Sequence, residues 1–383
     1  MKNRILLIIF ILLFSSVAFS GCLNTNASVD KTLVIQAIGV DYDFKKNEYI
    51  VSMQCYDLAK SGSKGEADTG KITKVFVSKG KSIKQAMDKT TQITGETPLD
   101  SQNRIIIFGE EVLKEGIEST IDLFIRDYRI RSNLPVAVAK GVKAEDIVKA
   151  NEGNAAIPAQ IIQLVMESGH LNSYCTEITV VDVVKLENEK TSSIIMPTLT
   201  IKKEKKNQYA KLDGLAIFKN NKLYDYLSPA ETRAFKFVID DIRAGTFVIE
   251  NTPMGRVTFS IVDSKTKTKT VITDNGKLEY DIKIKCSVDV TEAEKDSDDK
   301  ISNREAEVIQ DICNKKIKGD VENVLKKCLV EDKCDPFRFG QRLWQKSPEN
   351  YRKLSKDWAN VLPDIKTNIT VDTTIRRTGK FPM

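Results

Sequence analysis

Hydrophobic residues follow two different patterns along the chain, and the change between them falls near the middle. In the first half, runs such as Leu33 to Val40 are almost continuously apolar, which is typical of strands covered on both faces. In the second half, apolar and polar residues alternate over Leu278 to Val290 and Ile365 to Ile375. This alternation indicates one buried face and one solvent-exposed, or wet, face. The pattern predicts an α+β protein with two mixed sheet-and-helix domains.

The first half alternates predicted strands with predicted helices, as expected of an α/β-like layered sheet with helices against it. Strands are predicted at 33–40, 48–56, 71–78, 104–108 and 135–139, and helices at 82–92, 110–126 and 157–167. Ser82 and Gln85 form a capping box at the start of the first helix. Gly80-Lys81-Ser82 is no phosphate-binding loop, because Val75 occupies the position of the first glycine of that pattern.

The second half predicts a mainly antiparallel sheet with long helices. A hairpin is expected around Asn220-Asn221, a helix entering at Ser228-Pro229, and a turn at Asp274-Asn275-Gly276. A long helical region covers 302–330, with a break at Gly319, and the final strand should pair within the sheet of its own half. The lysine-rich run 202–206 is the predicted boundary between an N-terminal α/β domain, 31–201, and a C-terminal α+β domain, 207–383.

The first residues of the chain resemble an export signal. Lys2 and Arg4 precede an apolar segment from Ile5 to Phe14, which is too short for a membrane span, and Phe19-Ser20-Gly21-Cys22 follows. Small residues before a cysteine are typical of a lipobox, although Phe19 stands where leucine is commonest. We therefore predict a lipoprotein signal peptide at 1–21, lipidation of Cys22 and a spacer at 22–30. An ordinary signal peptide or an uncleaved N-terminal anchor is the alternative.

A lipidated Cys22 predicts where the protein works. Acyl chains contribute about 0.8 kcal/mol per buried methylene, so two or three of them, such as palmitate, hold a protein firmly to a bilayer. The polar spacer that follows spans at most about 28 Å. The protein is therefore expected to be lipid-anchored, extracytoplasmic and close to its membrane.

Composition narrows the function classes further. The chain is 41% hydrophobic and 29% charged, as in ordinary globular domains, and after the export signal the sequence has no apolar run long enough to span a membrane. The net charge of +6 is too small to indicate a nucleic-acid partner, although it suits an anionic lipid surface.

The sequence shows no arrangement typical of catalysis. The single histidine, His170, has neither a nucleophile nor an orienting acid at a recognisable spacing, so we interpret it as a helix-end residue. Asp296 to Asp299 lacks the glycine and the terminal glutamate of a calcium loop, and Asp41 with Asp43 is interpreted as structural rather than as a glycosidase pair. We therefore expect no enzyme, and assign no catalytic, cofactor-binding or metal-binding residue.

The cysteines after Cys22 support this expectation, because they form no Cys-x-x-Cys pair. We interpret most of them as small buried apolar residues, with Cys328 and Cys334 as the nearest candidates for a disulfide. These residues are Cys55, Cys175, Cys286, Cys313, Cys328 and Cys334.

Several short segments of the mature chain follow one another in a distinctive order. They are Ala37 to Asp41, Ile107 to Glu110, Ile121 to Asp127, Val136 to Gly141, Asp213 to Lys219, Asp335 to Gly340, and Trp358. Each segment alone is weak, but their order together with the lipobox resembles the C-subunit lipoproteins of spore germinant receptors, the Ger(x)C family. The resemblance covers nearly all of the mature chain.

The resemblance implies a non-enzymatic receptor subunit on the outer face of the inner spore membrane. It would assemble with an A subunit, partly embedded in the membrane, and a B subunit that resembles amino-acid transporters, so that a nutrient triggers germination. The resemblance leaves open which nutrient acts and whether this subunit contacts it. The exposed residues of Leu223 to Ser228 and the loop Ser61 to Gly70 are the candidate partner surfaces.

Two other classes compete with this interpretation. An extracytoplasmic solute-binding lipoprotein would need two similar α/β lobes joined by a hinge, whereas the second half is rich in alternating strands. An envelope hydrolase finds no support in the search for catalytic residues.

Overall fold

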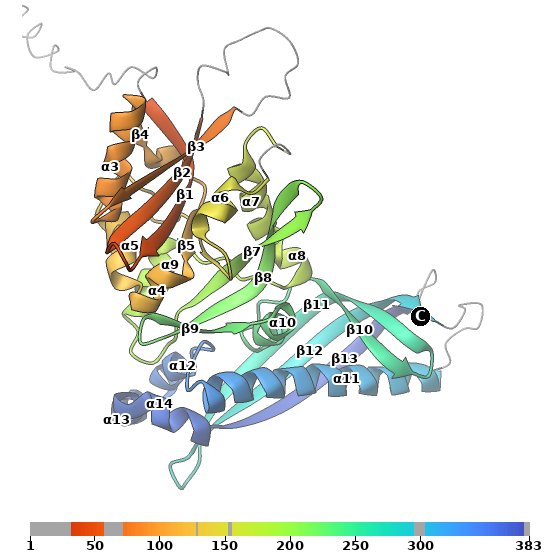
Figure 1. The fold of residues 1–383 in the computed structure, drawn as a ribbon. Helices are drawn as coiled ribbons and strands as arrows, with labels where there is room; N and C mark the ends of the chain where they lie inside the picture. The colour runs from red at the N-terminus through yellow and green to blue at the C-terminus, as the bar shows by residue number, and fades with distance from the viewer. Residues whose placement is uncertain (1–31, 57–71, 128, 152–154, 295–302, 379–383) are drawn as a thin grey trace, which may run out of the picture.

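The computed structural model describes residues 32–56, 72–127, 129–151, 155–294 and 303–378. These residues form two β-sheets with helices packed against them (Figure 1), which confirms the predicted α+β class. The predicted signal peptide, Cys22 and the spacer 22–30 lie outside the described residues, as do the loops 61–70 and 296–299.

The first sheet has nine strands in the order β3-β2-β1-β5-β6-β7-β8-β9, with β4 paired to β1. Its centre is parallel, because β1, β5, β6 and β7 run in the same direction, and its outer pairs are antiparallel. The strands are β1 (Thr32–Asp43), β2 (Glu48–Tyr56), β3 (Thr73–Gly80), β4 (Thr97–Leu99), β5 (Ile106–Gly109), β6 (Val136–Ala139), β7 (Ile195–Glu204), β8 (Asn207–Lys219) and β9 (Lys222–Leu227).

Helices cover both faces of this sheet, as the continuous apolar runs predict. Successive side chains of a strand point to opposite faces, and the neighbours Ile106 and Ile107 of β5 accordingly belong to two separate buried clusters. Residues of α3 (Ile83–Thr94), α4 (Glu110–Glu115), α5 (Glu118–Arg126) and α9 (Val180–Glu187) pack in one cluster. Residues of α6 (Ala144–Lys149) and α7 (Pro158–Glu167) pack in the other.

The second sheet has four strands in the order β10-β11-β12-β13. They are β10 (Gly245–Thr252), β11 (Gly255–Ile272), β12 (Leu278–Ala293) and β13 (Lys366–Thr378). The first three are antiparallel, and β13 pairs with β12 as predicted, but in parallel. A parallel partner needs a long crossover, and the helices between β12 and β13 supply it.

One face of the second sheet is covered by helices, as Figure 1 shows for α11. The inward side chains of β12 pack with residues of the helices, whereas Lys283 and Lys285 on the other face are exposed. The helices of this half are α10 (Pro229–Val238), α11 (Asn303–Leu325), a π-helix (Lys326–Glu331), α12 (Phe339–Lys346), α13 (Pro348–Leu354) and α14 (Trp358–Val361).

The lysine-rich run 202–206 forms the end of β7 and the hairpin turn that follows it, not a linker between sheets. It joins the end of β7 to the start of β8, and β8 and β9 continue the first sheet. The hairpin around Asn220-Asn221 is confirmed, but it belongs to the first sheet rather than the second. The lysine-rich composition predicted a domain boundary there because a solvent-exposed turn and a linker have similar compositions.

Two helix predictions need correction. The segment 110–126 forms two helices, because Gly116 between them adopts a φ of 137° that continues no helix. The predicted break at Gly319 is wrong, since α11 runs through it to Leu325 and then continues as the π-helix. A single glycine costs a helix only about 1 kcal/mol, and apolar residues on both sides of Gly319 keep α11 against the sheet.

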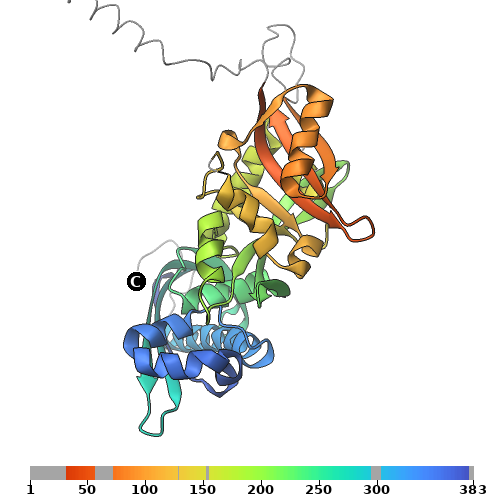
Figure 2. The same cartoon turned by 90° about the vertical axis from the view of Figure 1, so that its left-hand side faces the viewer.

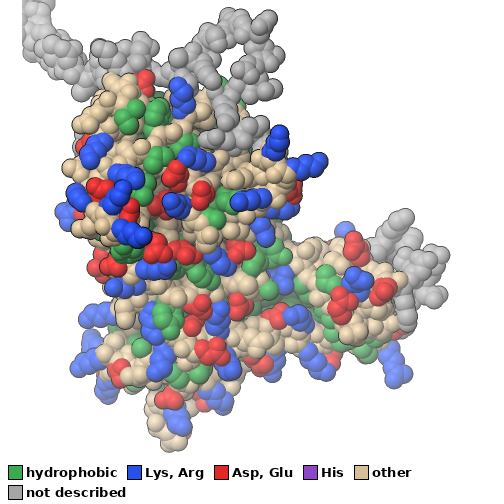
Figure 3. Space-filling model, in the orientation of Figure 1, with side chains coloured by type: hydrophobic (Ala, Val, Ile, Leu, Met, Phe, Trp, Pro, Cys, Tyr) green, Lys and Arg blue, Asp and Glu red, His purple; other side chains and the backbone are tan. Residues whose placement is uncertain are grey.

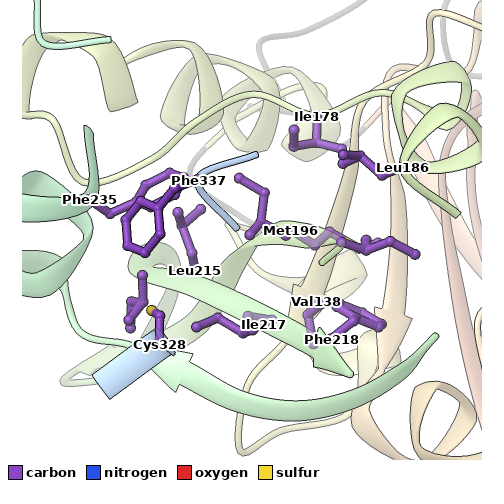
Figure 4. Close-up of a cluster of buried hydrophobic side chains, with 14 of the residues drawn as sticks. Val138, Ile178, Leu186, Met196, Leu215, Ile217, Phe218, Phe235, Cys328 and Phe337 are labelled. Carbon is purple, nitrogen blue, oxygen red and sulfur yellow. The ribbon is translucent and has the colours of Figure 1, made fainter. Parts of the chain in front are cut away.

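The two sheets share one buried cluster. Phe218 of β8 and Met196 of β7 lie in the same cluster as Phe235 of α10, Cys328 of the π-helix and Phe337 (Figure 4). The predicted caps at Ser82 and Ser228 are also confirmed, because each hydroxyl accepts a hydrogen bond from the backbone N–H three residues later. The halves therefore pack as one body, with β8, β9 and α10 at the joint.

Candidate functional site

The family-like segments gather at two places in the fold. The first is the carboxyl edge of the parallel strands β1, β5 and β6, where Asp41, Glu110 and Lys140 lie at or just beyond the strand ends. The second is the loop 335–340 between the π-helix and α12, at the joint of the two sheets. Carboxyl edges of parallel strands commonly hold ligands, so the hydrogen-bond partners of these side chains decide whether they are free to bind one.

Asp41 holds the start of α6 rather than a ligand. Its two carboxylate oxygens accept hydrogen bonds from the backbone N–H groups of Ala144, at 2.9 Å, and Glu145, at 3.0 Å. Gly109 is required beside it, because a Cβ there would approach Asp41 Oδ1 to 2.2 Å. Burial raises the pKa of Asp41, although the two backbone N–H groups oppose that shift.

Glu110 and Lys140 tie the same edge to the last strands of the sheet. Glu110 Oε1 accepts hydrogen bonds from the backbone N–H of Gly141, at 2.8 Å, and from the Tyr226 hydroxyl of β9, at 2.7 Å. Lys140 Nζ forms an ion pair with Asp213 of β8, at 2.7 Å, and lies 5.0 Å from the centre of the Tyr226 ring. Burial, followed by the hydrogen bond to Glu110, raises the pKa of Tyr226.

A cavity of about 740 Å³ opens above this edge, between the β1–β2 turn and the start of α6. Asp43 faces it, but its carboxylate accepts hydrogen bonds from the backbone N–H groups of Lys45 and Lys46 within the turn. Because Asp41 and Asp43 both bind backbone groups, the pair suits a structural role better than that of a glycosidase acid pair.

The second place centres on the buried side chain of Asp335. Its carboxylate accepts hydrogen bonds from the backbone N–H groups of Phe339, at 3.0 Å, and Gly340, at 2.8 Å, and from Trp358 Nε1, at 3.2 Å. Burial nevertheless raises the pKa of Asp335 to about 6. One carboxylate thus fixes both the start of α12 and the start of α14.

The aromatic residues of the loop bind it to the second sheet. Phe339 stacks on Tyr280 of β12, with ring centres 4.1 Å apart, and the Tyr280 hydroxyl donates a 2.6 Å hydrogen bond to the Phe339 carbonyl. The ring centre of Phe337 lies 5.4 Å from that of Phe339 on one side and 5.4 Å from that of Phe235 of α10 on the other.

The same loop also binds the segment that leads into β7. Ser193 and Asp335 exchange two hydrogen bonds, Ser193 N–H to the Asp335 carbonyl and Asp335 N–H to Ser193 Oγ, at 2.9 and 3.0 Å. Arg338 forms a 2.7 Å ion pair with Glu189. Gly340 allows close approach, since a Cβ there would meet Thr191 Oγ1 at 2.2 Å. The loop therefore clamps the first half of the chain to the second.

A second cavity, of about 680 Å³, lies beside this clamp and is lined from both halves. Ile178 and Leu186 come from the first half, Phe235 from α10, and Phe337 and Arg338 from the loop. Its lining combines these apolar side chains with three cations, Lys185, Arg338 and Arg342, and two carboxylates, Glu177 and Asp182.

The other residues singled out in the sequence take structural positions. His170 is exposed on the short helix α8 (Gly169–Asn172), and the six described cysteines are all buried, as predicted, with free thiols. Within the described part of the chain, no group of three or more His, Cys, Asp or Glu side chains could hold a metal ion. None of its helices is long and apolar enough to cross a membrane.

The candidate partner segment Leu223 to Ser228 forms β9 and the cap of α10. Tyr224 is 51% exposed, whereas Tyr226 is tied to Glu110. This link across the sheet could not be predicted, because neither residue carries a local signal for a partner so far away in sequence.

Comparison with known proteins finds two family models in order along the chain. The spore germination protein N-terminal domain matches residues 26–201, and the spore germination B3/GerAC-like C-terminal domain matches residues 213–379. The models divide the chain near the lysine-rich run, whereas the hydrogen-bonded sheets divide it after β9.

Several curated relatives cover nearly the full length. The chain is 26% identical to spore germination protein B3 of Bacillus subtilis (strain 168), over 92% of this chain and 93% of that protein. It is 24% identical to the putative spore germination protein YfkR of the same organism, over 95% and 94%, and 21% identical to spore germination protein GerQC of Bacillus cereus, over 97% and 98%.

A solved structure shares the fold. The crystal structure of the GerBC protein matches with a TM-score of 0.58 at 21% identity, covering 88% of this chain and 96% of that chain.

Proposed function

Because the chain belongs to the spore germination family whose N-terminal and GerAC-like C-terminal domains it carries in order, we propose that it is a lipoprotein subunit of a nutrient germinant receptor. Family membership by itself establishes a role in spore germination. In the proposal the protein has no enzymatic activity, lies on the outer face of the inner spore membrane, and works with A and B membrane subunits to trigger germination.

The observation that carries the proposal is the match of both family domains over residues 26–201 and 213–379, which leaves little of the mature chain unmatched. The use of the family-like residues supports it. Asp41, Glu110 and Asp335 all bind groups of the chain itself, which suits a rigid receptor component better than a catalyst.

The lipid anchor at Cys22 would set the geometry of the receptor. Only a short stretch separates Cys22 from Thr32, where β1 begins, and it spans at most roughly 35 Å when extended. The folded part would then work beside the subunits embedded in the same membrane.

Cys22→Ala tests the anchor. The substitution lies outside both sheets, so the variant should keep the far-ultraviolet circular dichroism and the unfolding midpoint of the wild-type protein. In fractionated spores it should move from the membrane to the soluble fraction. Cys55→Ala is the matched control, because Cys55 is a buried thiol of β2, and that variant should stay with the membrane. Full retention of Cys22→Ala in the membrane would contradict anchoring through this residue, and would mean that partners or an uncut signal hold the protein instead.

The alternative function is that of an extracytoplasmic solute-binding lipoprotein. Such proteins close two similar lobes around a ligand, whereas this chain joins a nine-stranded sheet to a four-stranded one through a shared core. Calorimetric titration of the chain with candidate nutrients separates the two functions. Saturable micromolar binding by the isolated protein would favour the solute-binding alternative.

A further inference from the structure

A groove of about 910 Å³ lies at the joint of the two halves, outside the clamp described above. Residues 188–191, which follow α9, form one wall, and α13 with the turn after it forms the other. Trp344 and Gln341 of α12 lie between them. The groove thus combines backbone from both halves, and the clamp fixes its walls relative to one another.

Trp344 is the unusual residue of this groove. The buried side of α12 packs on the core and consists of Phe339, Gly340 and Leu343. Trp344 is 53% exposed. Half-buried Tyr351 lies beside it in the groove. Large exposed aromatic side chains in a groove are typical anchors of protein interfaces.

The charges that line the groove are predominantly positive. Both acidic side chains have partners, since Glu189 pairs with Arg338 at 2.7 Å and Glu349 with Lys353 at 2.8 Å. Three exposed cations of the lining, Lys190, Arg352 and Lys356, have no ion-pair partner among the described residues. Figure 3 shows Lys and Arg side chains gathered over the end of the molecule that α12, α13 and α14 form.

An aromatic residue among cations could face either anionic lipid or an acidic protein segment, and the shape of the molecule distinguishes these. Figures 1 and 2 place the start of β1 at one end of the molecule and α12 to α14 at the other. In the proposed receptor, a tether of at most roughly 35 Å would hold the β1 end near the membrane, so the end that carries the groove would lie farther from the lipid.

We propose that the groove around Trp344 is a docking site for an acidic segment of a partner protein, anchored by one apolar side chain. The apolar side chain would cover Trp344 and Tyr351, and carboxylates of the segment would pair with Lys190, Arg352 and Lys356. The inference rests on the proposed function, because it gives the receptor subunit a contact with a partner at the end of the molecule far from its anchor.

Fluorescence provides a direct test, because the chain has only two tryptophans, and the second, Trp358, is buried against Asp335. The full mature chain, residues 22–383 with Cys22→Ala, is titrated with a short synthetic peptide of Glu and Ser that carries one central Leu. Binding should shift the Trp344 emission to the blue and weaken as salt is added. Trp344→Phe should abolish the shift.

Charge reversal with a matched control locates the binding. The triple variant Lys190→Glu, Arg352→Glu, Lys356→Glu should weaken peptide binding by about tenfold or more. The variant Lys267→Glu, Lys283→Glu, Lys285→Glu makes the same change in net charge on the wet face of the second sheet, and it should bind as the wild type does.

Two further probes identify the class of partner. A peptide with Lys in place of Glu should leave the emission unchanged, and so should vesicles of phosphatidylglycerol and phosphatidylcholine. The proposal is overturned if the acidic peptide causes no shift, if the vesicles shift the emission as strongly, or if both triple variants weaken binding equally.

A parallel measurement in spores separates this inference from the receptor role. If the groove variant loses the A and B subunits on purification while the control variant keeps them, the groove is their docking site. If both variants keep them, the groove assignment is wrong and the receptor role stands. A wild-type protein that purifies without them contradicts the receptor role itself.

Discussion

The first sheet is buried on both faces, whereas the second is buried on one face and wet on the other. In β5 the successive residues Ile106 and Ile107 are both fully buried, each in its own cluster. In β12 buried Ile282 is followed by exposed Lys283. The first sheet therefore serves as an internal frame, whereas the second sheet leaves one face exposed to solvent.

Alanine substitutions at these four positions should give the largest effects and test the comparison directly. Ile106→Ala and Ile107→Ala should each lower the free energy of unfolding by about 3 to 4 kcal/mol, because each leaves a cavity in a filled core. In β12, Ile282→Ala should cost about 3 kcal/mol and Lys283→Ala less than about 0.5 kcal/mol. Urea unfolding measures all four. Equal costs at Ile282 and Lys283 would mean that the second sheet is also covered on both faces.

Removing the carboxylate of the clamp should give the next largest effect. Asp335→Ala leaves the N–H groups of Phe339, Gly340 and Trp358 buried without an acceptor, so we expect a loss of about 3 kcal/mol. Asp372→Ala on the wet face of β13 is the control and should change stability by less than about 0.5 kcal/mol. If the two substitutions cost the same, the clamp does not hold the two halves together.

The next effect in size is the pH dependence of the stability that Asp335 contributes, and this stability should fall as the pH rises. Burial raises the pKa of Asp335 from 3.8 to about 6, so the folded protein retains this proton where the unfolded chain has lost it. The resulting stabilisation is complete below about pH 4 and is lost as the pH rises through about 6.

Asp335→Asn removes this titration and is the comparison that isolates it. Relative to the variant, the wild-type free energy of unfolding should fall by about 1 to 3 kcal/mol between about pH 4 and pH 7. Urea unfolding of both proteins at the two pH values gives the difference, which should be independent of pH if Asp335 stays ionised throughout.

The smallest expected effect concerns the wet face itself. Lys267 of β11 lies directly opposite Lys283 of β12, and like charges at such a position are unfavourable. Lys267→Glu should therefore stabilise the protein by about 0.5 kcal/mol. Lys269 lies opposite Asp281, so Lys269→Glu should destabilise the protein. Thermal unfolding at low salt measures the shift in unfolding temperature of each variant. Shifts in the same direction would exclude the cross-strand explanation.

Local patterns predicted most of the elements, because their causes are local. The alternation in β12, the caps at Ser82 and Ser228 and the turn at Asn220-Asn221 each depend on neighbouring residues, and the structure contains all of them. The run 202–206 shows where such reasoning ends. Its composition is that of a linker, and only the pairing of β7 with β8 reveals that the first sheet continues across it.

The family-like residues were found from their order, but their contacts were not predictable. The contacts of Asp335 depend on Trp358 and Ser193, which come from distant parts of the chain. Trp344 and Trp358 both lie in helices of the segment between β12 and β13, and only packing separates the exposed ring from the buried one. Lipidation at Cys22 stays a prediction.

Purification from spore membranes tests the receptor assignment most directly. The wild-type chain, carrying a C-terminal affinity tag, is extracted in mild detergent from the membranes of dormant spores, and the co-eluting proteins are identified by mass spectrometry. We predict that it elutes with an A-type and a B-type membrane subunit, and that the tag on an unrelated spore lipoprotein recovers neither. Elution of the chain alone, or its recovery mainly from vegetative cells, would contradict the account.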